Sequence, residues 1–497
     1  MFLLGYDLGS SSVKAALVDA RSGKAMAITQ YPESEMSILS PQIGWAEQEP
    51  EIWWENIQKV TEKILKVANL DSSEIVGVGI SYQMHGLVVV DSDHRSLRPS
   101  IIWCDSRAVS LGEEAFHAIG TDKCLSHLLN SPGNFTASKL KWVKDNEPDL
   151  FSKIHKIMLP GDFIAMKMTG EIKTTITGLS EGMLWDFEDQ KIASFLLDYY
   201  GIPESFIPDL VDAVGPQGKL TATAASVLGL PAGIPVGYRA GDQPNNAMSL
   251  GVLNAGEVAA TGGTSGVVYG VVDQPTTDEK TRVNSFAHIN YSASSQKVGV
   301  LLCINGAGIQ YSWLKRLAAD RGVDYTDMEK MAAEIAIGAD GLRIIPFGNG
   351  AERVLENRNI GSHMINIQFN RHSSAHLFRA GLEGIAFSFV YGIEIMKEMG
   401  LDVGVIRVGN DNLFQSEVFA TTIATLVGCE IQMVNTTGAV GAAKAAGVAA
   451  GCFDSIDDAF REMETVEIYR ADSDAKPYVT AYKVWKSDLE KLLKEHK

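Results

Sequence analysis

The 497-residue sequence lacks the features that mark several large classes of protein. Its five cysteines are scattered and form no CxxC pair, which argues against a disulfide framework or a zinc site and for reduced thiols in a cytoplasmic protein. No basic segment opens the chain, so we expect no signal peptide. The most apolar long run, residues 75–90, is interrupted by Ser81, Gln83 and His85. We therefore expect no membrane span.

Basic residues are also in the minority. The chain carries 61 acidic and 43 basic residues, for a net charge of −18. This balance disfavours nucleic acid or an anionic membrane surface as a partner, although a local basic cluster can still bind an anionic small molecule. The length exceeds that of one ordinary domain and predicts two large lobes. The oligomeric state is not decided by the sequence, and a homodimer stays open.

The first eighteen residues organise the rest of the chain. Residues 2–6 and 13–18 read as two buried strands, joined by a turn of glycine and small hydroxyl residues, 7–12. Such a turn presents free backbone N–H groups and hydroxyls that suit phosphate oxygens. Asp7 at its mouth would repel phosphate unless Mg²⁺ lay between them. The alternative is a tight hairpin whose aspartate satisfies local backbone groups.

The same pattern returns about half the chain later. Residues 257–260 and 267–272 read as strands around the turn Thr261–Gly266. Two such turns facing each other would clamp a triphosphate from both sides. In this repeated arrangement the chain resembles the FGGY carbohydrate kinases, ATP-dependent sugar kinases built from two duplicated actin-like halves.

The resemblance implies a fold and a division of the chain. It implies an α/β protein with two actin-like (ribonuclease H-like) lobes, each a mixed sheet flanked by helices, with a cleft between them. The expected lobes are residues 1–253, with the sugar side and the first hairpin, and 254–497, with the second hairpin and the adenosine side. Residues 110–237 carry no recognisable catalytic chemistry, and we expect them to be a family-specific elaboration.

The resemblance also implies the sugar side of the site. A buried strand, 75–81, leads into Gln83-Met84-His85-Gly86, where Met84 would pack on the sugar and His85 would hydrogen-bond a hydroxyl. A lone histidine is more often a structural residue. The run from Trp103 through Asp105 to Arg107 is similar to a family segment that lines the sugar, whereas the residues alone suggest an ion pair at a helix start.

Asp242 is the residue for which two interpretations compete most directly. It follows a predicted strand, 235–240, and precedes Pro244, as a helix N-cap would. The family has an acid in this Gly-Asp context, which implies that Asp242 is the catalytic base and contacts the sugar hydroxyl. The two roles are compatible, because a carboxylate at a helix N-terminus stays ionised.

The nucleotide side is implied by the same resemblance. The family pattern assigns ATP phosphates to Ser10, Ser11, Lys14, Gly263 and Thr264, and Mg²⁺ to Asp7. Gly409 and Asn410 stand where the family usually has glycines beside the adenosine. Asn and Asp tolerate positive φ better than other non-glycine residues, so a turn at 409–412 can form.

The loop at residues 83–86 is most similar to that of the xylulokinases within this family. The resemblance therefore implies phosphorylation of D-xylulose to D-xylulose 5-phosphate. Other family substrates remain as alternatives, namely ribulose, fuculose, rhamnulose and gluconate. An actin-like ATPase or sugar sensor without kinase activity is a rival of another class, and a pseudoenzyme is a third alternative.

Overall fold

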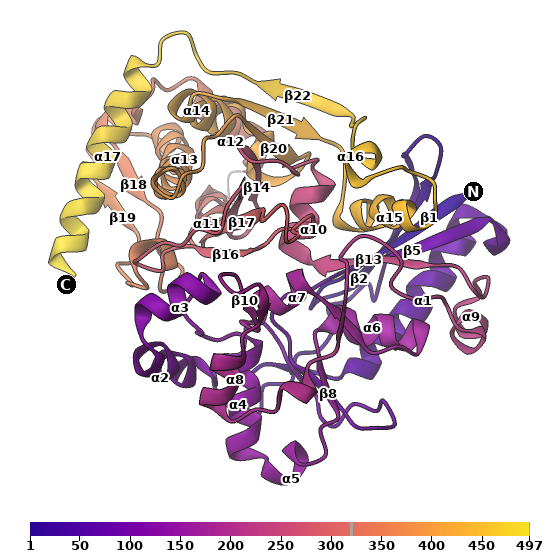
Figure 1. Ribbon diagram of the computed structural model, residues 1–497. Coiled ribbons are helices and arrows are strands. Elements are labelled where there is room, and N and C mark those ends of the chain that lie inside the picture. Colours follow the sequence, from indigo (N-terminus) through magenta and orange to yellow (C-terminus); the bar gives the residue numbers. More distant parts are fainter. Residues whose placement is uncertain (319–321, 497) are drawn as a thin grey trace.

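The computed structural model describes residues 1–318 and 322–496. Its two largest sheets are both mixed and carry helices on their faces (Figure 1). The first sheet contains, in spatial order, β13 (Val236–Gly241), β5 (Ile75–Tyr82), β1 (Phe2–Leu8), β2 (Val13–Asp19) and β3 (Ala25–Tyr31). In it β13, β5 and β1 run parallel, while β2 and β3 form antiparallel hairpins with their predecessors.

The alternation of side chains in β1 explains how this sheet is covered. Successive residues of a strand point to opposite faces. Leu4 lies in the apolar cluster beneath helix α1 (Pro50–Ala68), whereas Leu3 lies in the cluster formed with α15 (Gly438–Ala449). Helices α6 (Pro160–Thr169) and α9 (Ala222–Leu228) complete the α1 side. The first sheet is thus buried on both faces.

The second sheet has the same kind of hairpin at its centre. Its strands, in spatial order, are β16 (Asn284–Ala287), β17 (Val298–Ile304), β15 (Gly266–Val272), β14 (Glu257–Gly262), β20 (Val405–Gly409), β21 (Glu430–Val434) and β22 (Thr465–Tyr469). The hairpin of β14 and β15 is antiparallel, and β14 runs parallel to β20. The long helix α13 (Ser374–Glu398) packs on this sheet between α11 (Gly308–Ala318), α12 (Tyr325–Ala333) and α14 (Glu417–Val427), and α17 (Lys476–Glu495) lies outside it.

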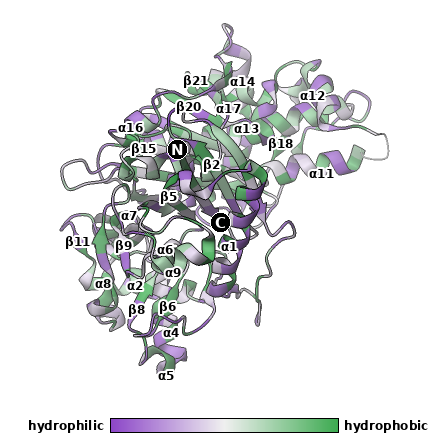
Figure 2. Ribbon diagram, turned by 90° about the vertical axis from the view of Figure 1, so that its right-hand side faces the viewer, coloured by the Kyte–Doolittle hydropathy of each residue, from purple (hydrophilic) through white to green (hydrophobic). Residues whose placement is uncertain are grey.

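The segment between β5 and β13 contributes α6 and α9 to the first sheet, and the rest of it forms a separate part of the molecule. The helices of this separate part are α2 (Val109–Ile119), α3 (Thr121–Leu128), α4 (Thr136–Asn146), α5 (Pro148–Phe151), α7 (Ile176–Glu181) and α8 (Ser194–Tyr200). In both Figure 1 and Figure 2, helices α2, α4, α5 and α8 lie together at one end, away from the large sheets. Asn130 joins this part to the second lobe, since it donates to the Ser285 carbonyl at 2.6 Å and accepts from the Ser285 backbone N–H at 3.0 Å.

Helix α15 lies on the first sheet although it follows the expected lobe boundary by almost two hundred residues. It packs on β1, β2, β5 and β13. Glycines in the strands allow this approach, because a Cβ on Gly5 would lie 2.0 Å from the Ala439 carbonyl oxygen, and one on Gly79 would lie 2.0 Å from that of Ala442. A single division of the chain near residue 253 therefore does not separate the residues that pack on the first sheet from those that pack on the second.

Several local expectations are confirmed, and two need adjustment. Apolar residues at helical spacing predict a helix at residues 50–68, and α1 has these bounds. Both predicted hairpins are also present. Asp242 is the first residue of helix α10 (Asp242–Ser249), so Gly241 and not Asp242 occupies the N-cap. In the turn after β20, Asn412 has a positive φ of 56° while Asp411 has a φ of −153°.

None of the helices in the described ranges, 1–318 and 322–496, combines the length and the apolar character needed to cross a membrane.

We expect Gly79→Ala to destabilise the protein, because the added methyl group would meet backbone atoms of α15 that cannot move independently of the helix. Overpacking of this kind typically costs about 1–3 kcal/mol. Thermal and urea unfolding measure the effect. Gly404→Ala is the matched control, since no atom other than the Gly256 oxygen at 3.7 Å lies near its added Cβ. Equal stability of the two variants would contradict the close packing of α15.

Candidate active site

Three parallel strands of the first sheet end beside one another with polar residues. Asp7 of β1 pairs in register with Ser81 of β5, and Gly241 of β13 pairs with Tyr82. The carboxyl ends of parallel strands meet at one edge of a sheet, which is where ligands bind in open α/β folds. Asp7 and Asp242, which follows Gly241 directly, are therefore brought to the same edge.

The two carboxylates at this edge influence each other. Asp7 accepts a hydrogen bond from the Ser81 hydroxyl at 2.9 Å, and its pKa is raised by burial, against the opposing effects of Ser81 and Lys14. Burial, and then the charge of Asp7, raise the pKa of Asp242 to about 7, while hydrogen bonds from Gln243 act in the opposite direction. Asp242 is thus poised to accept a proton near neutral pH.

The donor atoms around Asp7 fit a hard divalent cation. Mg²⁺ prefers carboxylate, hydroxyl and phosphate oxygens, and Asp7 and Ser81 supply a carboxylate and a hydroxyl. A dication beside Asp7 would also relieve the repulsion between Asp7 and Asp242. These residues therefore fit Mg²⁺ better than a softer metal, for which nitrogen and sulfur ligands are typical.

His85 is held in a strained and well-defined position after β5. Its φ is 62°, its carbonyl accepts from the Lys139 ammonium at 2.8 Å, and its ring lies 4.7 Å from that of Phe135 and 5.4 Å from that of Phe286. Burial, followed by the charge of Lys139, lowers the pKa of His85 to about 3. The imidazole is therefore neutral.

The tautomer of His85 follows from its hydrogen bond. Nδ1 lies 3.0 Å from the main-chain oxygen of Glu181. A carbonyl oxygen only accepts, so Nδ1 carries the proton and Nε2 is the acceptor. A side chain that is 18% exposed can offer this acceptor to the hydroxyl group of a ligand.

The other two residues predicted on this side have different environments. Trp103 is 54% exposed, and its indole nitrogen lies 3.5 Å from the Ser10 hydroxyl. Asp105 is fully buried, and its carboxylate accepts from the Ala46 backbone N–H and from the Arg107 guanidinium. Asp105 therefore ties the run from Trp103 to Arg107 to the backbone of Ala46, whereas Trp103 has surface available for a ligand.

Met84, in the loop 83–86 that holds His85, packs against Gly241 at the end of β13. It is buried, and a Cβ on Gly241 would lie 2.5 Å from its Cγ. Gly241 thus permits a close approach between the end of β13 and the loop after β5. This contact brings His85 and Asp242 into one site.

The first glycine turn is tied to the histidine loop by a glutamine that the sequence did not single out. Gln48 donates to the Ser10 carbonyl at 2.7 Å and accepts from the Gln83 side-chain amide at 3.1 Å. Ser11 and Lys14 are exposed at the same turn. The network leaves their polar groups available for an anion.

The second glycine turn, Thr261–Gly266, lies next to the turn after β20. The carbonyls of Gly263 and Thr264 accept from the first backbone N–H groups of α11 at 3.0 Å, and β14 packs on the short helix η6 (Asn412–Gln415). Since β14 and β20 are parallel neighbours, Gly409 and Asn410 emerge at the same edge. Four of the seven residues predicted to hold a nucleotide, Gly263, Thr264, Gly409 and Asn410, thus lie at one edge of the second sheet.

Helix α10 connects the edge of the first sheet that carries Asp7 with the edge of the second sheet that carries the turn 261–266. It begins with Asp242, and its Asn246 amide lies 3.4 Å from the Thr261 hydroxyl at the end of β14. Its Asn245 amide donates to the Gly438 carbonyl at 3.0 Å. One helix therefore links the first edge, the second hairpin and the start of α15.

Two charged residues near the site, Lys139 and Glu181, were missed by sequence reasoning, because they lie in the segment expected to carry no catalytic chemistry. A third, Arg353, ends a run, 348–353, that resembles the family's Gly-Glu-Arg loop, and it is the first residue of the short helix η5 (Arg353–Leu355). Burial lowers the pKa of Lys139 to about 7 and raises that of Glu181 well above its usual range. No local pattern marks such residues, because their burial depends on distant parts of the chain.

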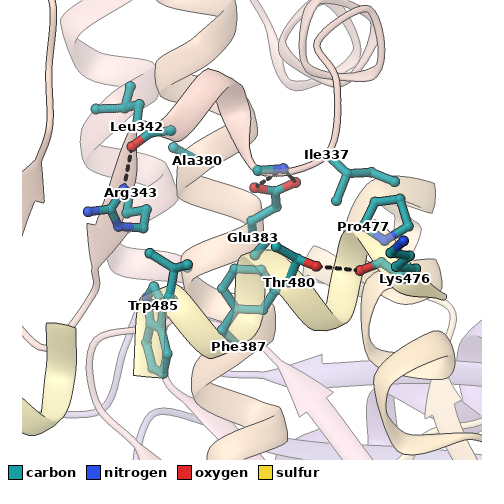
Figure 3. Close-up of a pocket in the computed structure, with 15 residues that line it drawn as sticks. Ile337, Leu342, Arg343, Ala380, Glu383, Phe387, Lys476, Pro477, Thr480 and Trp485 are labelled. Carbon is teal, nitrogen blue, oxygen red and sulfur yellow. Dashed lines mark hydrogen bonds between the residues drawn. The ribbon is translucent and has the colours of Figure 1, made fainter. Parts of the chain in front are cut away.

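A cavity of about 480 Å³ lies elsewhere, between α13 and α17 (Figure 3). Phe387 and Trp485 form part of its wall, and Glu383 accepts from the Gly338 backbone N–H at 2.9 Å. None of the predicted site residues lines it. The cavity is therefore separate from the candidate active site.

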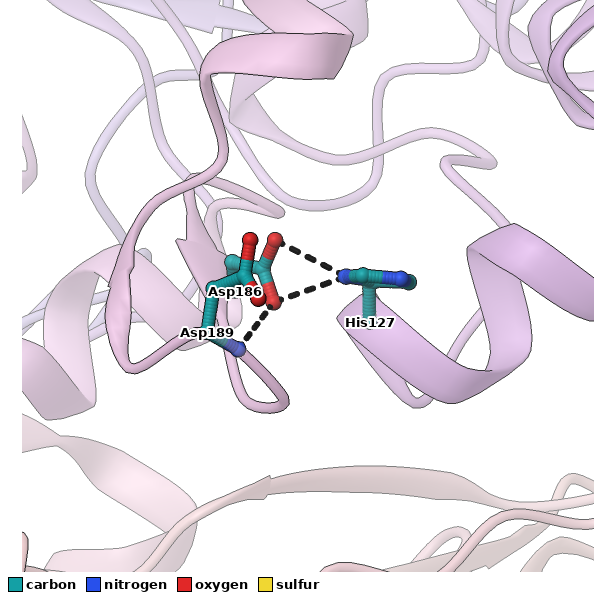
Figure 4. A group of neighbouring side chains, drawn as sticks. All are labelled: His127, Asp186 and Asp189. Atoms are coloured by element: carbon teal, nitrogen blue, oxygen red, sulfur yellow. Dashed lines mark hydrogen bonds and ion pairs between the residues drawn. The ribbon is translucent and has the colours of Figure 1, made fainter.

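A histidine with two aspartates resembles a metal site but is already satisfied (Figure 4). His127 Nδ1 lies 2.9 Å from both carboxylate oxygens of Asp186, and Nε2 lies 3.3 Å from Glu188. Asp189 pairs with Lys191 at 2.9 Å. Both imidazole nitrogens are engaged, so the cluster is explained by structural ion pairing.

Comparison with known proteins covers both lobes. Residues 2–249 match the N-terminal domain and residues 258–450 the C-terminal domain of the FGGY family of carbohydrate kinases. The chain is 29% identical over 503 residues to a xylulose kinase of Bacillus subtilis (strain 168), with 98% of this chain and 96% of the relative covered.

Solved structures share the fold over almost the full length. A xylulose kinase from Rhodospirillum rubrum is 25% identical, with a TM-score of 0.89 and 99% of each chain covered. A gluconate kinase from Lactobacillus acidophilus is 20% identical, with a TM-score of 0.88 and coverage of 100% of this chain and 99% of that one. The latter likeness concerns the fold alone.

We expect Asp7→Asn to lower the pKa of Asp242 from its value of about 7, because the substitution removes the neighbouring negative charge but keeps the burial. Carbon-13 NMR of protein labelled at the aspartate carboxyl groups, without nucleotide, would follow the titration. The exposed Asp93→Asn provides a control for the signal assignment and should leave Asp242 unchanged. An unchanged pKa in Asp7→Asn would mean that burial alone accounts for the shift.

Proposed function

Because the chain belongs to the FGGY family of carbohydrate kinases, we propose that this sugar kinase transfers the γ-phosphoryl group of ATP to the C5 hydroxyl of D-xylulose. The observation that carries the proposal is the position of Asp242, a half-buried carboxyl with a pKa of about 7, beside Asp7 and the loop of His85. A base with this pKa suits removal of a hydroxyl proton near neutrality.

The choice of D-xylulose rests on two supports. The Gln83–Gly86 loop is similar to that of the xylulokinases, and a curated xylulose kinase is 29% identical over nearly the full length. In the proposed complex Met84 packs on the carbon face of the ketose and Trp103 adds an exposed aromatic surface beside it. His85 accepts a hydrogen bond from a sugar hydroxyl through Nε2. Asp105 holds the segment that carries Trp103 through its hydrogen bonds with Ala46 and Arg107.

The phosphate side is assigned to the two glycine turns. Ser10, Ser11 and Lys14 in the first turn, with Gly263 and Thr264 in the second, contact the phosphates of ATP, and Gly409 and Asn410 lie beside the adenosine. Asp7 holds Mg²⁺, directly or through water. When bound, the cation reduces the negative charge that opposes transfer.

The chemical step needs little covalent participation by the protein. Phosphoryl transfer passes through a loose transition state in most analyses, so positioning and charge stabilisation dominate. Asp242 accepts the proton as the sugar oxygen bonds to phosphorus, and Lys14 offsets charge on the transferring group. Closure of the lobes would exclude water and limit ATP hydrolysis.

Gluconate is the second candidate, and Arg353 is the reason. The Arg353 guanidinium lies close enough to His85 to lower its pKa, and burial lowers the pKa of Arg353 itself. Within residues 1–318 and 322–496 no carboxylate forms an ion pair with it. A sugar acid would supply this partner, whereas a neutral ketose would not.

A coupled assay of ADP release across sugars tests the proposal. The panel contains D-xylulose, ribulose, fuculose, rhamnulose, gluconate and glycerol, each with Mg²⁺·ATP. The highest kcat/KM is expected for D-xylulose. A higher value for gluconate that falls on Arg353→Gln would favour the sugar-acid candidate. Nucleotide turnover independent of every acceptor would indicate an ATPase or sensor.

We expect Asp242→Asn to reduce kcat for sugar phosphorylation by roughly 10²–10⁴-fold, the usual contribution of a general base. ATP binding should be retained, because the phosphate contacts lie on other residues. Steady-state kinetics and calorimetric titration with ATP measure the two properties. The exposed Asp93→Asn is the control. Near wild-type turnover in Asp242→Asn would require a different base.

We expect His85→Ala to lower kcat/KM for the sugar by about three- to tenfold or more, since a lost neutral hydrogen bond costs about 0.5–1.5 kcal/mol. The KM for ATP should change little. Because the imidazole also packs between two phenylalanine rings, melting temperature must be measured alongside. The exposed His117→Ala serves as the control. Reduced stability with an unchanged sugar KM would favour a purely structural His85.

A further inference from the structure

Glu181 is a buried acid that none of the roles above uses. It is the last residue of α7, which packs on β13 and on β16. The side chain is only 2% exposed, and neither carboxyl oxygen makes a hydrogen bond of good geometry. Burying a polar group without well-formed hydrogen bonds costs free energy of folding.

The surroundings of Glu181 disfavour a negative charge. Asp162 of α6 and Asp242 of α10 face it with like charges, whereas the hydroxyl of Tyr82 of β5 and the backbone of His85 act in the opposite direction. The nearby cations are engaged elsewhere, because Lys139 of α4 donates to the His85 and Ile102 carbonyls, and Arg239 of β13 pairs with Asp162 at 3.2 Å. Burial first, and then the charges of Asp242 and Asp162, raise the pKa of Glu181 well above its usual range. This environment therefore favours the neutral form of the side chain.

Glu181 lies close both to His85 and to Gly241, the residue before Asp242. Its main-chain oxygen holds His85 Nδ1 at 3.0 Å, and its carboxyl Oε2 lies 3.9 Å from the same nitrogen. A Cβ on Gly241 would lie 2.8 Å from that carboxyl oxygen. The carboxyl therefore fills the space between the histidine and the residue directly before Asp242.

We propose that Glu181 is a positioning residue for sugar phosphorylation, whose buried carboxyl sets the separation between the imidazole of His85 and the carboxylate of Asp242. This inference rests on the proposed function, since it assumes that both groups meet the same sugar. An ionised Glu181 would place a second negative charge beside Asp242 and favour a charged His85, which can no longer accept through Nε2. Neutrality and size of the side chain are both required.

The kinetic test compares Glu181→Gln with Glu181→Ala. Glutamine keeps the size and the neutral charge, so it should retain nearly wild-type kcat/KM for the preferred sugar. Alanine removes the spacer, and misplacement of reacting groups typically costs roughly tenfold to a hundredfold in kcat/KM. In Glu181→Ala the KM for ATP should stay unchanged, and ADP release should exceed sugar phosphate formation. Glu383→Gln, a buried glutamate beside the cavity of Figure 3, is the matched control for a loss of stability alone.

Two kinetic outcomes would overturn the proposal. Equal impairment in Glu181→Gln and Glu181→Ala would show that the acid itself is needed. Loss of melting temperature in Glu181→Ala with unchanged sugar kinetics, as expected for Glu383→Gln, would show a structural role only.

Infrared spectroscopy tests the protonation of Glu181 independently of the proposed function, because the measurement needs no sugar. The difference spectrum between wild type and Glu181→Gln at pH 7 should contain the C=O band of a protonated carboxyl group. Absence of this band would overturn the neutral-acid assignment even in an active kinase. A wild-type protein that phosphorylates no sugar of the panel would reject the proposed function and with it the positioning role, whatever the infrared result.

Discussion

The close approach of α15 to the first sheet is the contact on which the rest of the structure depends. Gly5 and Gly79 leave room for the helix backbone, and at its start a Cβ on Gly438 would lie 2.8 Å from the Asp7 carboxylate. The Gly438 carbonyl also accepts from Asn245 of α10. The placement of this one helix therefore sets Asp7, the helix of Asp242 and the second lobe relative to each other.

The electrostatics of Asp242 show which of several effects prevails. A carboxylate in the first turn of a helix is stabilised by about 0.3–1 kcal/mol, which would lower its pKa by less than one unit at about 1.4 kcal/mol per unit. The pKa instead rises from 3.8 to about 7, because burial and the charge of Asp7 outweigh the helix. The same burial that makes Asp242 costly to ionise makes it a base of suitable strength.

The residues proposed to contact the sugar are held in place mainly by hydrogen bonds that involve main-chain oxygens. Lys139 and Glu181 fix His85 through main-chain oxygens, and Gln48 joins the first glycine turn to the loop after β5. Phe286 reaches the imidazole from the second lobe. The position of His85 thus depends on both lobes, so closure of the lobes and binding of a sugar would be coupled.

The sequence by itself determined the features that arise from local patterns. Alternating and continuous apolar runs around glycine turns identified both hairpins, helical spacing identified residues 50–68, and the resemblance assigned a role to Asp242. Tertiary structure alone revealed the burial of Glu181 and the packing of α15 on the first sheet. It also placed the N-cap at Gly241. These features depend on contacts between residues far apart in the chain, and desolvation, which shifts the pKa values, exists only once those contacts have formed.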